Sequence, residues 1–280
     1  MRCLCLLVVL SVLFVSNLTA MGRWEGRVAV VTGASSGIGA AIAKAFAEKG
    51  IIVIGVARRV HIIEEYAKTL TGVIHARQCD LTDEKQIIDL FKWINNSAIG
   101  GVDVLVNNAG ICKTSSLVDG ATAAWKSILD LNVLALSITT REALVSMKQK
   151  EYGHIFNINS VAGHTVPRLE GFHVGMYSAS KFAVTALTDA LRTELAEQKS
   201  PIKVTSISPG SVYTEMVRDL GRSLAGAVEG AAGPEGSDEM GPAPPGFLEV
   251  EDVVEAVLYA LGTRPSVQVH EIFVQAMAHL

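Results

Sequence analysis

Short runs of apolar, mostly β-branched residues alternate with longer helical patterns from Arg27 to the end of the chain. The early runs are continuously apolar, which is typical of strands buried on both faces. We predict strands at Val28–Thr32, Ile51–Val56, Val73–Cys79, Val102–Asn107, Gly153–Asn159, Ile202–Ser208 and Val267–Val274. Helical patterns between them include Ala40–Lys49, Glu84–Ile94, Ala121–Met147 and Tyr177–Gln198. This alternation predicts an α/β fold, a doubly wound, mostly parallel sheet of about seven strands with helices on both faces.

One segment, Gly221 to Gly246, interrupts this pattern because it is rich in Gly, Ala and Pro. A loop of this length inside a compact domain is usually functional or disordered. Two interpretations stay open, a mobile lid over a substrate pocket and a tolerated surface insertion. The 280 residues, 49% of them hydrophobic, suit one large domain over residues 21–280 better than two small ones.

The first twenty residues form a separate element. Arg2 precedes an apolar run from Cys3 to Val15 and a short polar patch, the outline of a secretory signal. Leu18 stands where a cleavage site prefers a small residue, and the apolar run is short for a membrane span. Met21 also opens a segment that would suit the start of a protein. Residues 1–20 are therefore either a signal peptide or anchor, which places the protein in the secretory route, or an N-terminal extension of a cytoplasmic protein.

Charge and cysteine content exclude several classes of function. The net charge is −4 and no basic run occurs, which disfavours a nucleic-acid-binding surface. Outside the first twenty residues only Cys79 and Cys112 remain, and neither has metal-ligand spacing. We therefore expect neither a disulfide framework nor a metal site.

A glycine-rich turn follows the first predicted strand directly. It contains Gly33, Ala34, Ser35, Ser36, Gly37, Ile38 and Gly39, and a helix begins at once. Glycines permit a tight turn and let the backbone approach a pyrophosphate, whose charge then lies at a helix N-terminus. The turn lacks the Gly-Lys-Ser/Thr ending of a P-loop, which argues against an NTPase. The pattern predicts a dinucleotide site, with a purely structural turn as the alternative.

The second predicted strand is followed by Arg58 and Arg59. In dinucleotide-binding sheets this edge reaches the adenosine ribose, where an acid favours a free 2′-hydroxyl and an arginine favours a 2′-phosphate. We therefore predict NADP(H) rather than NAD(H) as the cofactor. Two solvated arginines after a strand are the alternative.

Tyr177 and Lys181 lie four residues apart, which places them on the same face of the predicted helix. A cation beside a phenol favours the phenolate, so the sequence predicts that Lys181 lowers the pKa of Tyr177 and allows proton transfer near neutral pH. Ser160 follows a buried strand at the sheet edge where ligands bind, and its hydroxyl suits either a substrate carbonyl or a local cap.

With the glycine turn, Asn107-Asn108-Ala109-Gly110, Ser160, Tyr177-x-x-x-Lys181 and Pro209-Gly210, the chain resembles the short-chain dehydrogenase/reductase family from about Arg27 onward. The resemblance implies a Rossmann-like fold in which Tyr177 is the acid or base, Ser160 positions the substrate oxygen, Lys181 also holds the nicotinamide ribose, and Asn132 relays protons through water. The spacing from Ser160 to Tyr177 exceeds the family's usual one, so the residues around Arg168 to His173 are expected to bulge beside the pocket.

The resemblance also implies the positions that contact the cofactor. Beyond the glycine turn and the two arginines, these are Glu64, Asp80, Leu81, Asn108, Ala109, Gly110, Tyr177, Lys181, Pro209, Gly210, Ser211, Val212 and Thr214. Tyr213 or Met216 is then expected to face the substrate.

The expected reaction is reversible hydride transfer between the nicotinamide and an alcohol or carbonyl carbon of an apolar substrate. Trp24, Ala57–Arg59 and Val267–Glu271 look like the insect farnesol dehydrogenases and the group called SDR family member 11, which favours a terpenoid alcohol such as farnesol. A steroid or other lipid ketone is the alternative, and a sensor or scaffold that binds NADP(H) without turnover is the alternative of another class. The family also implies a homodimer or homotetramer that packs through the helices in Ala121–Met147 and Tyr177–Gln198.

Overall fold

The computed structural model describes residues 21–168, 173–225 and 242–277. The predicted signal peptide or extension at residues 1–20 lies outside this described part. So do residues 226–241 of the Gly- and Pro-rich segment and residues 169–172 of the expected bulge. The first residues of the Gly- and Pro-rich segment, up to Ala225, belong to a helix.

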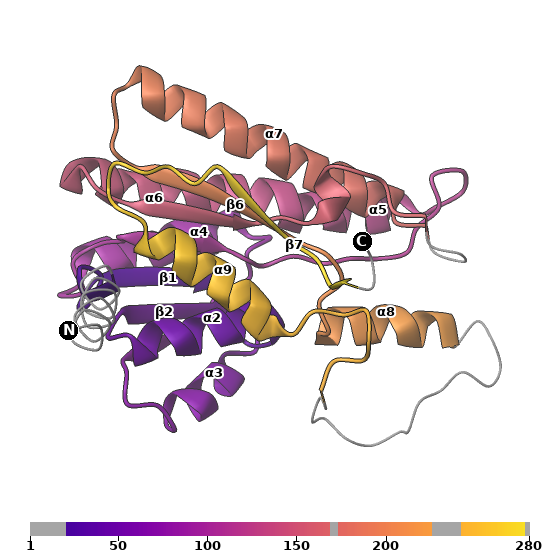
Figure 1. Cartoon of the computed structure of the whole chain (residues 1–280), viewed down its shortest axis with the longest axis horizontal. Helices are drawn as coiled ribbons and strands as arrows, with labels where there is room; N and C mark the ends of the chain where they lie inside the picture. Colours follow the sequence, from indigo (N-terminus) through magenta and orange to yellow (C-terminus); the bar gives the residue numbers. More distant parts are fainter. Residues whose placement is uncertain (1–20, 169–172, 226–241, 278–280) are drawn as a thin grey trace, which may run out of the picture.

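A seven-stranded sheet forms the centre of the molecule (Figure 1). Its strand order is β3-β2-β1-β4-β5-β6-β7, and every neighbouring pair is parallel. The order reverses beside β1, so the carboxyl ends of β1 and β4 flank the crevice where such sheets bind ligands. The strands are β1 Val28–Thr32, β2 Ile52–Ala57, β3 Ile74–Gln78, β4 Val104–Asn107, β5 His154–Ile158, β6 Lys203–Pro209 and β7 Glu271–Val274. The predicted α/β class is confirmed.

Helices cover both faces of this sheet (Figure 1). On one face α2 and α9 bury Phe46 and Val257 in one core, and on the other α4 and α6 bury Phe91 and Met147 in a second core. The helices are α2 Gly37–Glu48, α3 Val60–Ala67, α4 Glu84–Asn96, α5 Thr122–Leu129, α6 Leu136–Lys150, α7 Gly175–Glu197, α8 Glu215–Ala225 and α9 Val250–Gly262. Within the described residues, none of them combines the length and the apolar character that crossing a membrane requires.

The predicted strand at Val267–Val274 is shortened to β7, Glu271–Val274. The reason is a side chain that replaces the backbone ladder. Gln268 accepts a hydrogen bond from the Val204 amide through Oε1 at 3.1 Å and donates to the Val204 carbonyl through Nε2 at 2.6 Å. The segment before Glu271 therefore runs beside β6 without backbone pairing at Val204.

The predicted helix over Ala121–Met147 is interrupted by a π-helical turn at Asp130–Ala135, which separates α5 from α6. Single π-helical turns occur often at functional sites because they rotate one residue out of the regular helical pattern. Asn132 lies in this turn and is 2% exposed. The π-helical turn therefore gives Asn132, the predicted relay residue, a position that it would not have in a regular helix.

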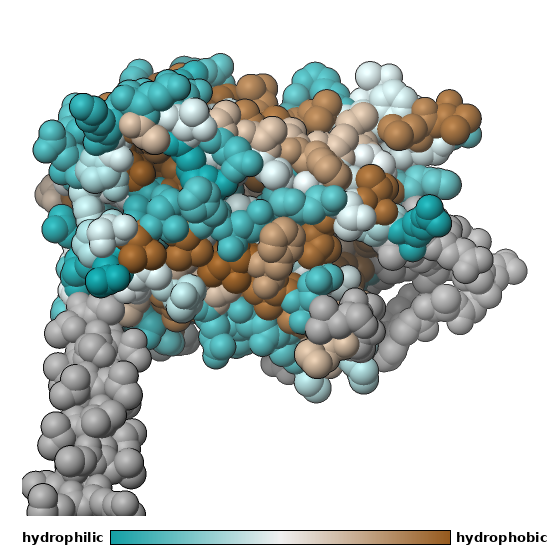
Figure 2. Space-filling model, turned by 45° about the horizontal axis from the view of Figure 1, so that its top comes forward, coloured by the Kyte–Doolittle hydropathy of each residue, from teal (hydrophilic) through white to brown (hydrophobic). Residues whose placement is uncertain are grey.

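Helices α6 and α7, which are expected to form subunit contacts, expose apolar side chains. Val145 on α6 is 48% exposed, and Phe182 and Leu187 on α7 are 43% and 36% exposed. Figure 2, which brings the α7 side of the molecule forward, shows apolar side chains interspersed with hydrophilic ones. The homodimer or homotetramer stays a prediction, which light scattering on the purified protein would contradict if it found only monomers.

His154 opens β5 and is fully buried at the amino-terminal edge of the sheet. Its Nε2 lies 2.8 Å from Thr205 Oγ1, and its ring stacks on Phe156 with the centroids 4.0 Å apart. Burial, and then the charges of Lys203 and Arg23, hold the pKa of His154 well below its usual value. The imidazole is therefore neutral in the folded protein.

This buried imidazole is expected to make the folded protein sensitive to mild acid. Because its pKa is lower in the folded than in the unfolded state, the unfolded chain binds the proton first as the pH falls below about 6.5. The free energy of unfolding should then fall by up to about 1.4 kcal/mol per pH unit from this group. The free energy of unfolding, measured by urea titration at several values from neutral pH to mild acid, should depend less on pH in His154→Gln than in the wild type. The matched variant at the exposed His270, His270→Gln, should keep the wild-type dependence, and equal slopes for all three proteins would contradict the assignment.

Candidate active site

The glycine turn joins β1 to α2 with a conformation that requires glycine. Gly33 and Gly37 have φ values of +68° and +53°, and a Cβ on Gly33 would lie 2.9 Å from Asn108 Nδ2. A Cβ on Gly39 would overlap the carbonyl oxygen of Gly33. The Ser36 side chain does not cap α2, so it leaves the first-turn amides for another acceptor. The turn therefore presents backbone N–H groups and the positive end of a helix to an anion.

The end of β4 is fastened to the end of β1 across the crevice. Thr32 Oγ1 accepts hydrogen bonds from the amides of Asn108 and Ala109 at 2.9 and 3.0 Å. Asn108 Nδ2 donates to the Thr32 carbonyl oxygen at 2.9 Å. These bonds hold the Asn108–Gly110 segment beside the glycine turn, and this segment lines the cavity that the turn opens into.

A groove of about 520 Å³ runs from the glycine turn to the ends of β2 and β3. Arg58, Arg59, Asp80 and Leu81 line it. Asp80 Oδ1 accepts hydrogen bonds from the amide and hydroxyl of Thr82, which lower the pKa of this carboxyl. Both arginines and an ionised acid therefore surround one end of the groove.

A second cavity, of about 450 Å³, continues from the glycine turn to the end of β5. Ser160, Tyr177 and Lys181 line it together with the predicted cofactor positions Pro209, Gly210, Ser211, Val212 and Thr214. Apolar side chains complete the wall, namely Val161, Pro167, Val174, Met216, Val217 and Leu220. Three of the predicted catalytic residues therefore meet in one largely apolar cavity next to the dinucleotide groove.

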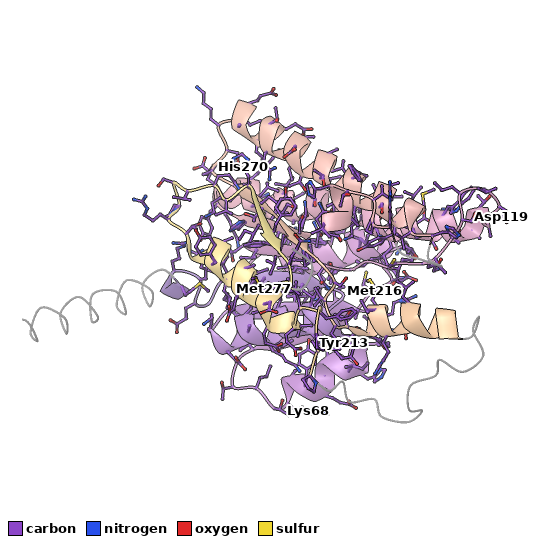
Figure 3. The ribbon with its side chains drawn as sticks, turned by 45° about the vertical axis from the view of Figure 1, so that its right-hand side comes forward. Lys68, Asp119, Tyr213, Met216, His270 and Met277 are labelled. Carbon is purple, nitrogen blue, oxygen red and sulfur yellow. The ribbon has the colours of Figure 1, made fainter. Side chains whose placement is uncertain are left out.

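Some predicted residues line neither cavity. Ala34 and Gly39 belong to the glycine turn but do not line either cavity, and Glu64 is exposed on α3. Of the two residues expected to face the substrate, Met216 lines both cavities, whereas Tyr213 packs its ring against Phe247 with the centroids 6.2 Å apart. Both residues are labelled in Figure 3, where the chain passes from β6 into α8.

Ser160 follows β5 and holds a short 3-10 turn at Val161–Gly163. Its Oγ accepts a hydrogen bond from the Ala162 amide at 3.1 Å, and it donates to the Pro209 carbonyl oxygen at the long distance of 3.5 Å. The serine is therefore a local cap, as the alternative interpretation held. Because the bond that it donates is long, its proton is also free to turn toward another acceptor in the cavity.

Tyr177 is the third residue of α7, and Lys181 lies one turn further along. The Lys181 Nζ is 5.8 Å from the centre of the Tyr177 ring and donates to the Ile158 carbonyl oxygen at 2.8 Å. The bond to Ile158, the last residue of β5, ties α7 to the end of this strand. Tyr177 and Lys181 therefore lie on the same face of α7, as predicted.

The electrostatics of this pair differ from the sequence-based expectation. The sequence predicts that Lys181 lowers the pKa of Tyr177, but burial raises this pKa above its usual value, and a hydrogen bond with Ser160 opposes the rise only in part. Burial lowers the pKa of Lys181 to about 8. Burial is the largest cause of both shifts, because desolvation disfavours the phenolate and the ammonium alike.

Asn132 connects the end of β4 to the helix of Tyr177. Its Oδ1 accepts from the Ile111 amide at 2.9 Å, and its Nδ2 donates to the Ile111 carbonyl oxygen at 2.9 Å and to Ser180 Oγ at 3.0 Å. Ser180 Oγ in turn donates to the Tyr177 carbonyl oxygen at 2.6 Å. The side chain of Asn132 thus holds protein groups at both ends, so its predicted role in proton relay stays a prediction.

Two residues of the site carry no signal in the sequence that would have identified them. Cys112 lines both cavities, and burial raises the pKa of its thiol to about 11, so it is a neutral part of the wall. Glu215 also lines both cavities and binds Arg59. An acid in the first turn of a helix is ordinary, and only the folded chain brings Glu215 next to Arg59.

Comparisons with known proteins show which family the chain is similar to. Residues 27–225 match the model of the short chain dehydrogenase family. Dehydrogenase/reductase SDR family member 11 of Mus musculus is 45% identical over 90% of this chain and 95% of the mouse protein. A farnesol dehydrogenase of Aedes aegypti is 45% identical over 91% of this chain and 98% of its own length.

Solved structures show the same fold. An alcohol dehydrogenase from the archaeon Thermococcus sibiricus, complexed with 5-hydroxy-NADP, superposes with a TM-score of 0.73 at 25% identity over 90% of this chain and 97% of its own. A serine dehydrogenase complexed with NADP⁺ gives a TM-score of 0.75 at 27% identity over 90% of this chain and 95% of its own. With a family model that covers most of the chain and relatives at 45% identity over nine-tenths of it, the chain belongs to the short-chain dehydrogenase/reductase family of oxidoreductases.

Proposed function

We propose that this protein is an NADP(H)-dependent oxidoreductase that transfers a hydride between the nicotinamide and an alcohol or carbonyl carbon of an apolar substrate. The observation that carries the proposal is the meeting of Ser160, Tyr177 and Lys181 in a cavity continuous with the glycine turn. The cradle at Gly33 and Gly37, which any Cβ would fill, fits the backbone approach that a pyrophosphate needs. The named cofactors of the two structural neighbours support the same choice.

Arg58 and Arg59 support the phosphorylated form of the cofactor. Both lie at the end of the groove where the adenosine ribose of a dinucleotide would reach. A guanidinium offers a fork of N–H donors that matches a phosphate, whereas the 2′-hydroxyl of an unphosphorylated ribose favours an acid. The Arg58 and Arg59 side chains would hold the 2′-phosphate, and the α2 N-terminus would hold the pyrophosphate.

In the proposed reaction a bound nicotinamide supplies the hydride for reduction and accepts it in oxidation. Tyr177 donates the proton from Oη to the substrate oxygen in reduction and removes it in oxidation. The Ser160 hydroxyl turns from its long bond to Pro209 toward the substrate oxygen and stabilises its developing charge. Lys181, which is largely protonated below its pKa of about 8, keeps a positive charge beside the phenol.

The proposed substrate is apolar, and a terpenoid alcohol such as farnesol is favoured. The wall of the cavity around Ser160 and Tyr177 supplies Val161, Pro167, Val174 and Met216, which contribute apolar surface. The likeness to the farnesol dehydrogenase of Aedes aegypti points to the same class. The same wall also suits a steroid or other lipid ketone, which is the second candidate.

The test is turnover by the purified protein, followed through the absorbance of the reduced nicotinamide. NADPH and NADH are each offered with terpenoid aldehydes, steroid ketones and small dicarbonyl compounds. We expect turnover with NADPH that is fastest for a terpenoid aldehyde, since the wall of the cavity is largely apolar. Faster turnover of steroid ketones would select the second candidate. Tight NADPH binding without turnover on any of these compounds would contradict the proposal and favour a sensor.

A further inference from the structure

Arg59 is held by a carboxylate that comes from the opposite side of the cofactor groove. Its Nη1 donates to Glu215 Oε1 at 2.8 Å and its Nη2 donates to Glu215 Oε2 at 2.6 Å. Nη2 also donates to Ser36 Oγ at 3.2 Å. The three residues stand at the starts of α3, α2 and α8, so one guanidinium joins three segments that are distant in the sequence.

Arg58 and Arg59, which we propose bind the same phosphate, therefore differ in their ion pairing. Among the described residues Arg58 forms no ion pair, whereas both outer nitrogens of Arg59 are bound to Glu215. Both arginines and Glu215 line one groove, and the Arg59 and Glu215 side chains are 46% and 31% exposed. An anion that entered the groove from solvent would reach Arg58 directly but would find Arg59 already paired.

Glu215 uses the part of Arg59 that a phosphate would also use. Glu215 occupies the Nη1–Nη2 edge of the Arg59 guanidinium, and Ser36 shares Nη2. A phosphate would have to displace the carboxylate from this edge or use the remaining Nε side next to it. If the carboxylate stayed in place, its charge would also repel a phosphate bound at Arg58. A 2′-phosphate must therefore displace Glu215 or bind beside a like charge, and both lower its affinity.

We propose that Glu215 competes with the 2′-phosphate of the cofactor for Arg59 and so weakens the preference of this protein for the phosphorylated cofactor. The inference rests on the proposed use of NADP(H). It has a consequence for the substrate side, because Met216 follows Glu215 and lines both cavities, and Val217 and Leu220 line the cavity of Ser160 and Tyr177. A phosphate that takes Arg59 releases the carboxylate that ties the first turn of α8 to the cofactor groove.

The test measures binding of two fragments by calorimetry, 2′,5′-ADP, which carries the 2′-phosphate, and 5′-AMP, which lacks it. Glu215→Gln removes the charge and keeps the size of the side chain. We expect it to strengthen binding of 2′,5′-ADP by about tenfold and to leave binding of 5′-AMP nearly unchanged. Weaker or unchanged binding of 2′,5′-ADP would overturn the inference, because Glu215 would then help the site or play no part in it.

Two further variants separate the ion pair from the general charge of α8. Asp219 lies on the same helix and lines the same groove, and Asp219→Asn should improve 2′,5′-ADP binding much less than Glu215→Gln. In an Arg59→Met background, Glu215→Gln should bring no gain of this size. Equal gains in 2′,5′-ADP affinity from Glu215→Gln and Asp219→Asn would show that the effect does not depend on the Arg59–Glu215 pair. An undiminished gain from Glu215→Gln in the Arg59→Met background would show the same.

The wild-type protein supplies the control that separates this inference from the proposed function. If it binds 2′,5′-ADP no better than 5′-AMP, the proposed preference for NADP(H) is contradicted. If it discriminates between them but Glu215→Gln brings no gain, only the competition is contradicted. Hydrogen exchange gives a second readout, in which 2′,5′-ADP should speed exchange at the start of α8 in the wild type but not in Arg59→Met.

Discussion

Replacing Tyr177 with phenylalanine is expected to lower kcat by about three orders of magnitude while the protein stays folded and keeps its affinity for NADPH. The change removes one oxygen atom from the cavity and with it the proton that the substrate oxygen needs. Acid-base groups of this kind contribute about 10²- to 10⁴-fold to a rate. The ring remains to fill its place in α7, so the loss should fall on kcat and not on the binding of the cofactor.

The control is a second tyrosine, at which the same substitution should not change turnover. Tyr259 on α9 is 68% exposed, and Tyr259→Phe should turn over substrate at the wild-type rate. Both variants should bind NADPH as the wild type does in a fluorescence titration. Turnover by Tyr177→Phe within tenfold of the wild type would contradict the assignment of the proton to Tyr177, whereas lost NADPH binding would show that the hydroxyl acts through cofactor binding or structure.

Burial shifts the pKa values of Tyr177 and Lys181 in opposite directions. Burial raises the pKa of Tyr177 and lowers that of Lys181 to about 8, so the neutral phenol is the stable form near neutral pH. A neutral phenol is the form that donates a proton, which suits reduction, whereas oxidation needs the phenolate.

The core of the fold follows from the sequence because local pattern and burial point the same way. Val28–Thr32 is apolar at each of its first four positions, and β1 has the bounds that this run predicts, with every residue buried. The strand at the edge of the sheet was harder to predict. Val267–Val274 carries enough apolar residues to predict a full strand, but the long-range bonds of Gln268 to Val204 replace its first ladder pairs, and no local rule reveals such a partner.

The candidate site was predictable to the extent that its residues belong to short motifs. Ser160 is recognisable because it follows a buried strand, and Tyr177 and Lys181 because they lie four residues apart on one helix. All three line one cavity. The ion pair of Arg59 with Glu215 joins residues 156 positions apart, and its existence depends on how α8 lies across the groove. The π-helical turn that carries Asn132 was equally hidden, because the sequence of Ala121–Met147 suits a regular helix throughout.

Replacing Arg58 with aspartate is expected to reverse the choice of cofactor. Arg58 follows β2, is exposed in the groove and forms no ion pair among the described residues, so its charge is available to the 2′-phosphate. The change removes a charge-assisted hydrogen bond, worth about 1.5–3 kcal/mol, and adds a carboxylate that repels the phosphate. The ratio of kcat/KM for NADPH to that for NADH should therefore fall by about 10²- to 10³-fold.

The new carboxylate is also placed to accept a hydrogen bond from the 2′-hydroxyl of NADH, so activity with NADH should be kept or raised rather than lost. This distinguishes a change of specificity from general damage, in which both cofactors would lose activity together. Arg264→Asp makes the same change of charge at an exposed position outside both cavities and should leave the ratio unchanged. A ratio that Arg58→Asp leaves at the wild-type value would refute the role of Arg58, and Arg59, released from Glu215 by the incoming phosphate, would then have to carry the preference alone.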